Sequence, residues 1–205
     1  MTFLLRSLFG AGLVCLLLAA GRADGQAGEL AEFRQRQTAT FNSAGHAKAN
    51  GLEISLNYPR SWRAGEGARP HIVQNFLAPP GVAANCNLLI LAGQPGTTEA
   101  QVRASVEPRR AAEQLPANAE NVRSQATTID GLPAAELIFD STVNRAGLTM
   151  HARLVIYIAA FRTSLVQLTC LAGGANPSER SARFGAYQPL FRLIANSLVV
   201  HNRWR

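Results

Sequence analysis

Apolar and polar residues alternate from Leu52 to Tyr58, with Leu52, Ile54, Leu56 and Tyr58 on one side and polar residues between them. A period of two is typical of a β-strand that buries one face. The run from Leu88 to Ala92 is instead apolar at almost every position, which indicates a strand covered on both faces. Similar patterns predict further strands over 71–78, 120–129, 133–143, 148–161 and 164–172.

Two segments have the spacing of helices. Thr98 and Gln101 have the capping-box pattern at the start of 98–115, and Pro108 predicts a break or kink within that segment. Near the C-terminus an apolar stripe with helical spacing predicts a helix that lies on the sheet. Because proline is tolerated in the first turn, we expect this helix to begin close to Pro189. The stripe consists of Tyr187, Leu190, Phe191, Ile194 and Leu198.

The order of these elements predicts the fold class and the domain organisation. Strands joined mostly by hairpins, with Asp130-Gly131 as one tight turn, and helices kept apart from them indicate an α+β fold with a largely antiparallel sheet of about six to seven strands. Residues 24–50 are polar and rich in Ala, Gly and Gln, with a short helix around 29–37. We therefore predict a flexible N-terminal segment over 24–50 and a single domain over 51–205.

The N-terminus has the pattern of a secretory signal peptide. Arg6 precedes a short apolar stretch, and small residues follow at Gly21 and Ala23, so we predict a signal over 1–23 that is cleaved after Ala23. An uncleaved anchor is the alternative. A lipoprotein would need Cys15 as its processing site, but the bulky Val14 precedes it and apolar residues continue beyond it. The predicted location is periplasmic or secreted.

Two cysteines, Cys86 and Cys170, remain after the predicted cleavage. Both lie in apolar, strand-like runs and not in a Cys-x-x-Cys spacing. In an oxidising compartment the pair is a candidate disulfide. Two separate buried thiols are an equally good interpretation of the sequence.

Charge and composition exclude several function classes. The chain of 205 residues is 47% hydrophobic and 16% charged, which is globular, and its net charge of +7 falls to +5 without residues 1–23. The basic residues are scattered, so nucleic-acid binding is not predicted. No His spacing suits a metal, and no nucleophile motif occurs. Glu136 and Asp140 share a strand face, where we expect a solvated surface or pairing with Arg153. We predict no enzyme, no metal and no cofactor.

Several motifs together resemble one family. They are Tyr58-Pro59-x-x-Trp62, "IDGLPAAEL", "LVQLTCLAG" and "YQPLFRLIANSLVV", and in this order they are similar to the PsbP/DcrB-like family over about residues 51–200. The resemblance implies an α/β/α sandwich around an antiparallel sheet. It also implies a non-enzymatic partner of a larger assembly, although this fold alone fixes no function.

Two functions are consistent with these observations. The first is an exported interaction module that docks on a protein or a membrane-bound envelope complex, with membrane association only through a partner or an uncleaved signal. The second is a carrier of a small ligand or lipid in a cleft between sheet and helix. Within the motif after the first strand, we expect Tyr58, Pro59 and Trp62 to be structural. Arg60 and Arg63 flank Trp62 and form the candidate binding corner.

Overall fold

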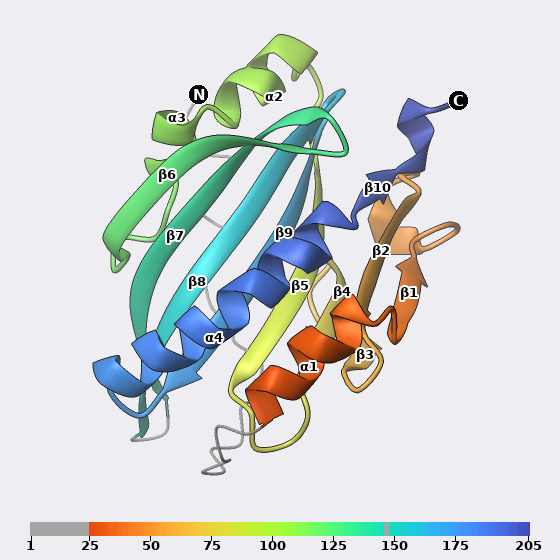
Figure 1. Ribbon diagram of the computed structural model, residues 1–205. Coiled ribbons are helices and arrows are strands. Elements are labelled where there is room, and N and C mark those ends of the chain that lie inside the picture. Colours follow the sequence, from red (N-terminus) through yellow and green to blue (C-terminus); the bar gives the residue numbers. More distant parts are fainter. Residues whose placement is uncertain (1–24, 146–147) are drawn as a thin grey trace.

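The computed structural model describes residues 25–145 and 148–205 (Figure 1), so the predicted signal peptide over 1–23, with Cys15, lies outside them. A seven-stranded sheet forms the centre of the fold, in the order β3-β4-β5-β9-β8-β7-β6, and every neighbouring pair is antiparallel. Its strands are β3 (Arg63–Glu66), β4 (Ile72–Leu77), β5 (Ala84–Ala92), β6 (Glu120–Ile129), β7 (Leu132–Arg145), β8 (Leu148–Phe161) and β9 (Ser164–Gly174). The predicted α+β class and antiparallel sheet are confirmed.

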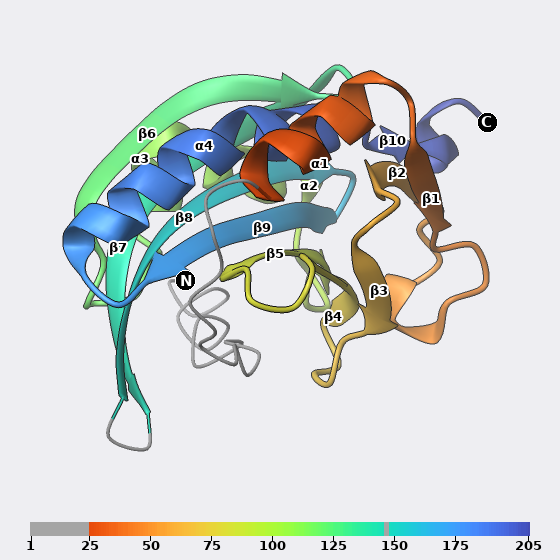
Figure 2. The same cartoon turned by 60° about the horizontal axis from the view of Figure 1, so that its bottom comes forward.

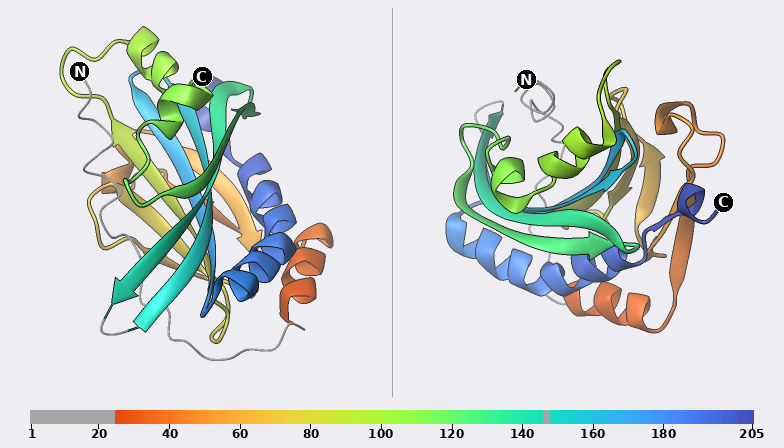
Figure 3. Two further views of the ribbon diagram at one scale, coloured as in Figure 1. Left: turned by 90° about the vertical axis from the view of Figure 1, so that its left-hand side faces the viewer. Right: turned by 90° about the horizontal axis from the view of Figure 1, so that it is seen from above.

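Helices cover both faces of this sheet (Figure 3). The helix α4 (Pro177–Asn196) lies across β8 and β9, and α1 (Gly25–Arg34) packs beside α4. The short helices α2 (Glu99–Ser105) and α3 (Pro108–Ala112) pack on the other face, over β6, β7 and β8. The layers are therefore those of an α/β/α sandwich. We call the two sides of the sheet the α4 face and the α2 face.

The prediction of a flexible segment over 24–50 is wrong for its described residues. From Gly25 the chain forms α1, then β1 (Thr38–Asn42) and the 3-10 helix η1 (Ala47–Ala49). Leu30 and Phe33 of α1 pack against the main core. The strand β1 pairs with β2 (Ile54–Pro59), which also pairs with β10 (Val199–Val200), so a second sheet of three strands stands beside the first (Figure 2). Among the described residues, α1 and β1 therefore pack with the rest of the domain, and η2 (His201–Arg203) follows β10.

The C-terminal helix begins twelve residues earlier than Pro189 predicts. Asn176 is its N-cap, since the side-chain oxygen accepts the N–H of Glu179 at 2.9 Å, and Pro177 occupies the first turn. Pro189 lies inside the helix. The predicted apolar stripe is buried against the sheet, because Tyr187, Leu190, Phe191, Ile194 and Leu198 all belong to the main core cluster. The prediction of the stripe is confirmed and that of the helix start is wrong.

Three local predictions are confirmed by the structure. Thr98 and Gln101 form a capping box, with both hydrogen bonds present, and the predicted break at Pro108 separates α2 from α3. Asp130 and Gly131 both have positive φ, as a tight hairpin turn between β6 and β7 requires.

Candidate docking surface

The corner that follows β2 is held by backbone hydrogen bonds on both sides. The N–H of Trp62 bonds to the carbonyl of Pro59 at 3.0 Å, which closes a turn between β2 and β3. The N–H of Arg60 bonds to the carbonyl of Gln37 at 3.2 Å, which ties the turn to the start of β1. The turn is therefore fixed between two strands of different sheets.

Trp62 and Tyr58 are structural residues of this corner. The Trp62 side chain is only 3% exposed, and its ring centroid lies 6.5 Å from that of Tyr187 on α4. Tyr58 is half-buried with its ring centroid 4.8 Å from that of Phe76, and Pro59 is buried. Trp62 thus packs beside the C-terminal helix, and its large apolar surface contributes to the core and not to a binding surface.

A buried carboxylate from α1 completes this packing. Glu29 is 4% exposed and accepts a hydrogen bond from the Tyr187 hydroxyl. Burial raises the pKa of Glu29, although Tyr187 and the nearby Trp62 indole oppose the rise. The Trp62 indole N–H forms no hydrogen bond with good geometry among the described residues, so its effect on Glu29 is a weak one. Glu29 joins α1 to α4 at an energetic cost of desolvation.

Four arginines surround the corner. Arg60 and Arg63 are exposed, as the sequence predicts, and Arg34 and Arg36 from the end of α1 are exposed beside them. Glu32 places Arg34 and Arg36 there, because its carboxylate accepts the N–H of Ser61 at 2.8 Å and so holds the end of α1 against the turn. Among the described residues, no ion pair or side-chain hydrogen bond involves these four guanidinium groups. We call Arg34, Arg36, Arg60 and Arg63 the basic corner.

Sequence reasoning found half of the basic corner. Arg60 and Arg63 flank a turn that the strand pattern locates. Arg34 and Arg36 lie in the segment predicted to be flexible, where no apolar period fixes a position. The signal that could have placed them is the weak apolar pair Leu30 and Phe33, which pack against the core.

Glu136 and Asp140 do not form a solvated face, which corrects one of the two expectations for them. They are 4% and 1% exposed and lie on the α4 face of β7. The expected pairing with Arg153 is present: Arg153 Nε lies 2.6 Å from Asp140 Oδ1, across the β7–β8 pair. Arg180 Nη2 of α4 lies 3.2 Å from Asp140 Oδ2, and Arg192 Nη2 lies 3.1 Å from Glu136 Oε2.

These ion pairs control the protonation of Asp140. Burial raises the pKa of its carboxyl, but hydrogen bonds from Arg153 and Asn121 and the charges of Arg153 and Arg180 more than offset this, so the pKa lies below its usual value. A carboxylate held in this way stays ionised and fully bonded. It connects the sheet to α4 and has no free position for acid-base chemistry.

The α2 face carries a row of buried carboxamides where it runs over β4, β5 and β9. Asn75, Asn87 and Thr169 are direct register partners across these three strands. Asn85 and Gln167 lie on the same face and are 1% and 3% exposed. Both amide atoms of Asn85 lack a hydrogen-bond partner, and so do the amide oxygens of Asn75, Asn87 and Gln167. Buried polar atoms without partners are uncommon in folded proteins and call for an explanation.

Cys86 and Cys170 form a disulfide, which decides between the two interpretations of the sequence. They are register partners on β5 and β9, both are fully buried, and the bridge closes a separation of 84 residues. Within residues 25–145 and 148–205, no three His, Cys, Asp or Glu side chains gather so as to hold a metal ion. In the same part of the chain, no helix combines the length and the apolar character that crossing a membrane requires.

No protein-family model matches this chain, and no curated protein matches it. Several solved structures, in contrast, are similar to this chain. The chain is similar to cyanobacterial PsbP (CyanoP) from Synechocystis sp. PCC 6803, with 16% identity and a TM-score of 0.49 over 80% of this chain and 92% of that one. It is also similar to LpqN, involved in cell envelope biogenesis of Mycobacterium tuberculosis, with 13% identity and a TM-score of 0.45 over 82% and 93% of the two chains.

A protein from Bacteroides thetaiotaomicron is similar as well, with 13% identity and a TM-score of 0.47 over 80% of this chain and 48% of that one. A PsbP is therefore among the solved structures that this chain resembles. At such identities the similarity concerns the fold alone.

Proposed function

We propose that this protein is a non-enzymatic, exported interaction module that docks on an envelope partner through the basic corner. The observation that carries the proposal is the set of four exposed arginines, which form no ion pair among the described residues, around one rigid turn. Guanidinium groups bind carboxylates in bidentate geometry, and unpaired surface charge steers association with a partner of opposite charge. The partner surface that fits this corner is acidic.

The disulfide supports the exported location. Disulfides persist in oxidising compartments such as the periplasm and are rare in the cytosol. The bridge lies in the main core cluster, between two central strands of the sheet. A protein stabilised in this way is suited to an extracytoplasmic role, which agrees with the signal peptide predicted over 1–23.

Affinity capture with a matched control tests the proposal. The tagged protein is incubated with a solubilised envelope fraction as wild type, as the Arg60→Gln/Arg63→Gln variant and as the Arg103→Gln/Arg123→Gln variant, which removes two exposed arginines far from the corner in sequence. We expect the same partner with wild type and control, and its loss with the corner variant and at high salt. Equal capture by the corner variant, or no partner for wild type, would contradict the proposal.

A second candidate function is the small-ligand carrier, and the buried carboxamides favour it over a purely structural role for the α2 face. Their unpartnered atoms include donors and acceptors, so they match a ligand that both donates and accepts hydrogen bonds. The cleft between sheet and α4, where the sequence places the ligand, is instead filled by core side chains such as Phe184 and Phe191.

The carrier function is tested by Asn85→Leu, which replaces an unsatisfied amide by an apolar group of similar size. If the site has no ligand, this change raises the stability of the purified protein, since no hydrogen bond is lost. If a ligand is bound, mass spectrometry of the native wild-type protein detects it and the variant loses it. A more stable variant together with a ligand-free wild type would contradict the carrier function.

A further inference from the structure

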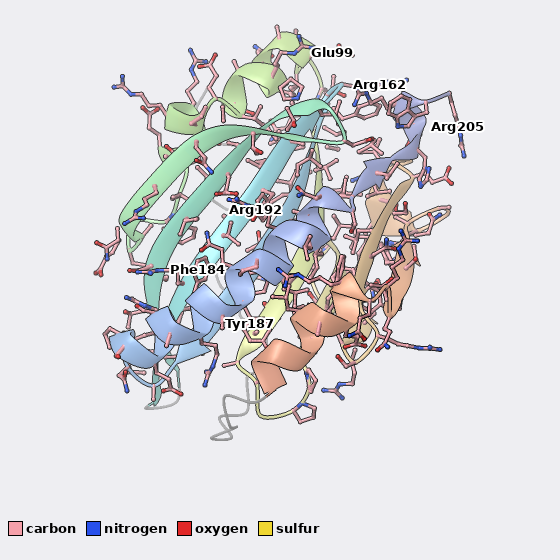
Figure 4. All side chains as sticks on the ribbon, in the orientation of Figure 1. Glu99, Arg162, Phe184, Tyr187, Arg192 and Arg205 are labelled. Atoms are coloured by element: carbon pink, nitrogen blue, oxygen red, sulfur yellow. A yellow bond between two sulfur atoms is a disulfide. The ribbon has the colours of Figure 1, made fainter. Side chains whose placement is uncertain are left out.

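A groove of about 440 Å³ runs along the exposed side of α4, next to the end of α1. Gly185, Gln188, Pro189, Arg192 and Asn196 line it from α4, and Arg34 lines it from α1. These α4 positions and the half-buried Leu193 form a stripe of mixed polarity on the side of the helix opposite to the buried apolar stripe. Arg192, labelled in Figure 4, lies in the C-terminal third of the helix.

The groove offers open hydrogen-bonding groups of the helix itself. Pro189 has no N–H, so the carbonyl of Gly185, four residues earlier, lacks its helical donor. Gly185 also has no side chain to cover this carbonyl, and a Cβ placed there would meet nothing within 4 Å. Gln188 and Asn196 carry side-chain amides that have no partner among the described residues. The stripe therefore presents an acceptor and two carboxamides.

The charge of the groove is positive and continuous with the basic corner. The Arg192 side chain is 52% exposed, and only its Nη2 contacts Glu136, so other N–H donors of this guanidinium are open. Arg34 has no ion pair among the described residues and belongs both to the groove and to the basic corner. A ligand in the groove can therefore continue onto Arg36 and Arg60 without leaving positive surface.

We propose that the groove between α1 and α4 binds an extended acidic peptide segment of a partner protein, which continues from the groove onto the basic corner. Carboxylates of such a segment match Arg34 and Arg192. Its main-chain N–H and C=O groups match the Gly185 carbonyl and the amides of Gln188 and Asn196. Leu193, which is half-buried, and Pro189 are the apolar side chains that line the groove, and the exposed large apolar side chains of the described residues, Val122 and Trp204, lie outside it, so a lipid surface fits less well. The inference rests on the proposed docking function.

A labelled peptide of alternating Glu and Gly, about ten residues and roughly 33 Å long when extended, is the probe. The stripe from Gly185 to Asn196 spans about 17 Å, so the peptide is long enough to reach the corner. Binding is measured by fluorescence anisotropy at low salt, with the Lys-Gly peptide as the reference. We expect the acidic peptide to bind and the basic peptide not to bind.

Gly185→Phe is the decisive variant, because it fills the groove from a position where an added side chain meets no neighbour. We expect Gly185→Phe and Arg34→Gln each to raise the Kd about tenfold, a loss of about 1.4 kcal/mol. The matched control is Ser178→Phe, an exposed position on α4 outside the groove, which should leave the Kd unchanged. Equal thermal midpoints confirm that all the variants fold.

The outcomes separate the groove from the corner. If Arg60→Gln/Arg63→Gln weakens binding and Gly185→Phe does not, the groove inference is overturned while the docking function stands. If the acidic peptide does not bind at low salt, the groove inference is overturned, and affinity capture decides on the corner. Binding to phosphatidylglycerol vesicles that Gly185→Phe abolishes, without peptide binding, would assign the groove to a membrane and also overturn the inference.

Discussion

Arginines have opposite roles in two regions of this molecule. Between α4 and the sheet, Arg153 and Arg180 bond to Asp140, which is 1% exposed, and Arg192 bonds to Glu136. At the basic corner, Arg34, Arg36, Arg60 and Arg63 are exposed and have no ion pair among the described residues. A buried charge must be paired because desolvation is costly, whereas an exposed charge is free to meet a partner. Arginine thus stabilises the fold in the first region and is available to bind a partner in the second.

Asp140→Asn should produce the largest effect, because it removes the negative charge between Arg153 and Arg180. We expect a loss of about 3–5 kcal/mol in the free energy of unfolding, as is usual when one partner of a buried pair is removed. Urea denaturation measures it. The control is Glu113→Gln, which breaks an exposed pair with Arg109 and should cost about 0.5 kcal/mol or less. Similar losses of unfolding free energy for both variants would show that a buried arginine pair contributes no more stability than an exposed one.

Trp62→Ala tests whether the basic corner rests on a buried support. Trp62 is 3% exposed against Tyr187, so we expect a loss of about 3 kcal/mol or more, typical of truncating a buried aromatic side chain. Chemical denaturation of the variant provides the measurement. Trp204 is 67% exposed, and Trp204→Ala should change the stability by about 0.5 kcal/mol or less. An unchanged midpoint for Trp62→Ala would mean that this indole is free to bind and is not a support.

Glu29→Gln probes a buried carboxyl that, unlike Asp140, has no arginine to hold its charge. Burial raises the pKa of Glu29, so between its usual value of 4.5 and the raised value the folded state binds more protons than the unfolded chain. Stability from this group therefore falls as the pH rises through that window, so the buried carboxyl costs stability at neutral pH.

We therefore expect Glu29→Gln to be more stable than wild type at about pH 7, with a difference that shrinks at about pH 4 because wild-type Glu29 is then protonated. Gln can still accept the Tyr187 hydroxyl, so the contact between α1 and α4 remains. Urea midpoints at the two pH values give the result. A difference that does not depend on pH would contradict the raised pKa.

The smallest effect on stability is expected for Arg60→Gln/Arg63→Gln. Both side chains are exposed without an ion pair among the described residues, so the free energy of unfolding should change by no more than about 0.5 kcal/mol. Thermal denaturation checks this, and the binding assays above should show the loss instead. A clear loss of stability in this variant would show that Arg60 and Arg63 support the fold. It would then contradict the contrast between the two groups of arginines.

The sequence located most of the sheet but missed the N-terminal part of the domain. The strand with a clear period of two, over 52–58, is present as β2 because burial of one face imposes that period, and the segments 71–78 and 164–172 are present as β4 and β9. The segment over 24–50 has no such period, since no residue of β1 is fully buried. Its position comes from pairing with β2 and from contacts of Leu30 and Phe33 with the core, which are distant in sequence.

The start of α4 was also missed, for a different reason. Proline in a helix interior removes one hydrogen bond and is usually excluded, so Pro189 indicated a helix end. The packing of Phe184, Tyr187 and Phe191 in the core outweighs that loss in this fold. Asn176-Pro177 and Glu179 were the local signal for the true start.

By itself the sequence determined the α+β class, the strand periods, the turn at Asp130-Gly131 and the inward position of Trp62, because these depend on patterns within a few neighbouring residues. Only the tertiary structure decided that Cys86 and Cys170 are bridged, that Glu136 and Asp140 are buried with arginines, and that Arg34 and Arg36 join Arg60 and Arg63. The physical reason is that pairing and charge compensation depend on distances between segments far apart along the chain, which no local period encodes.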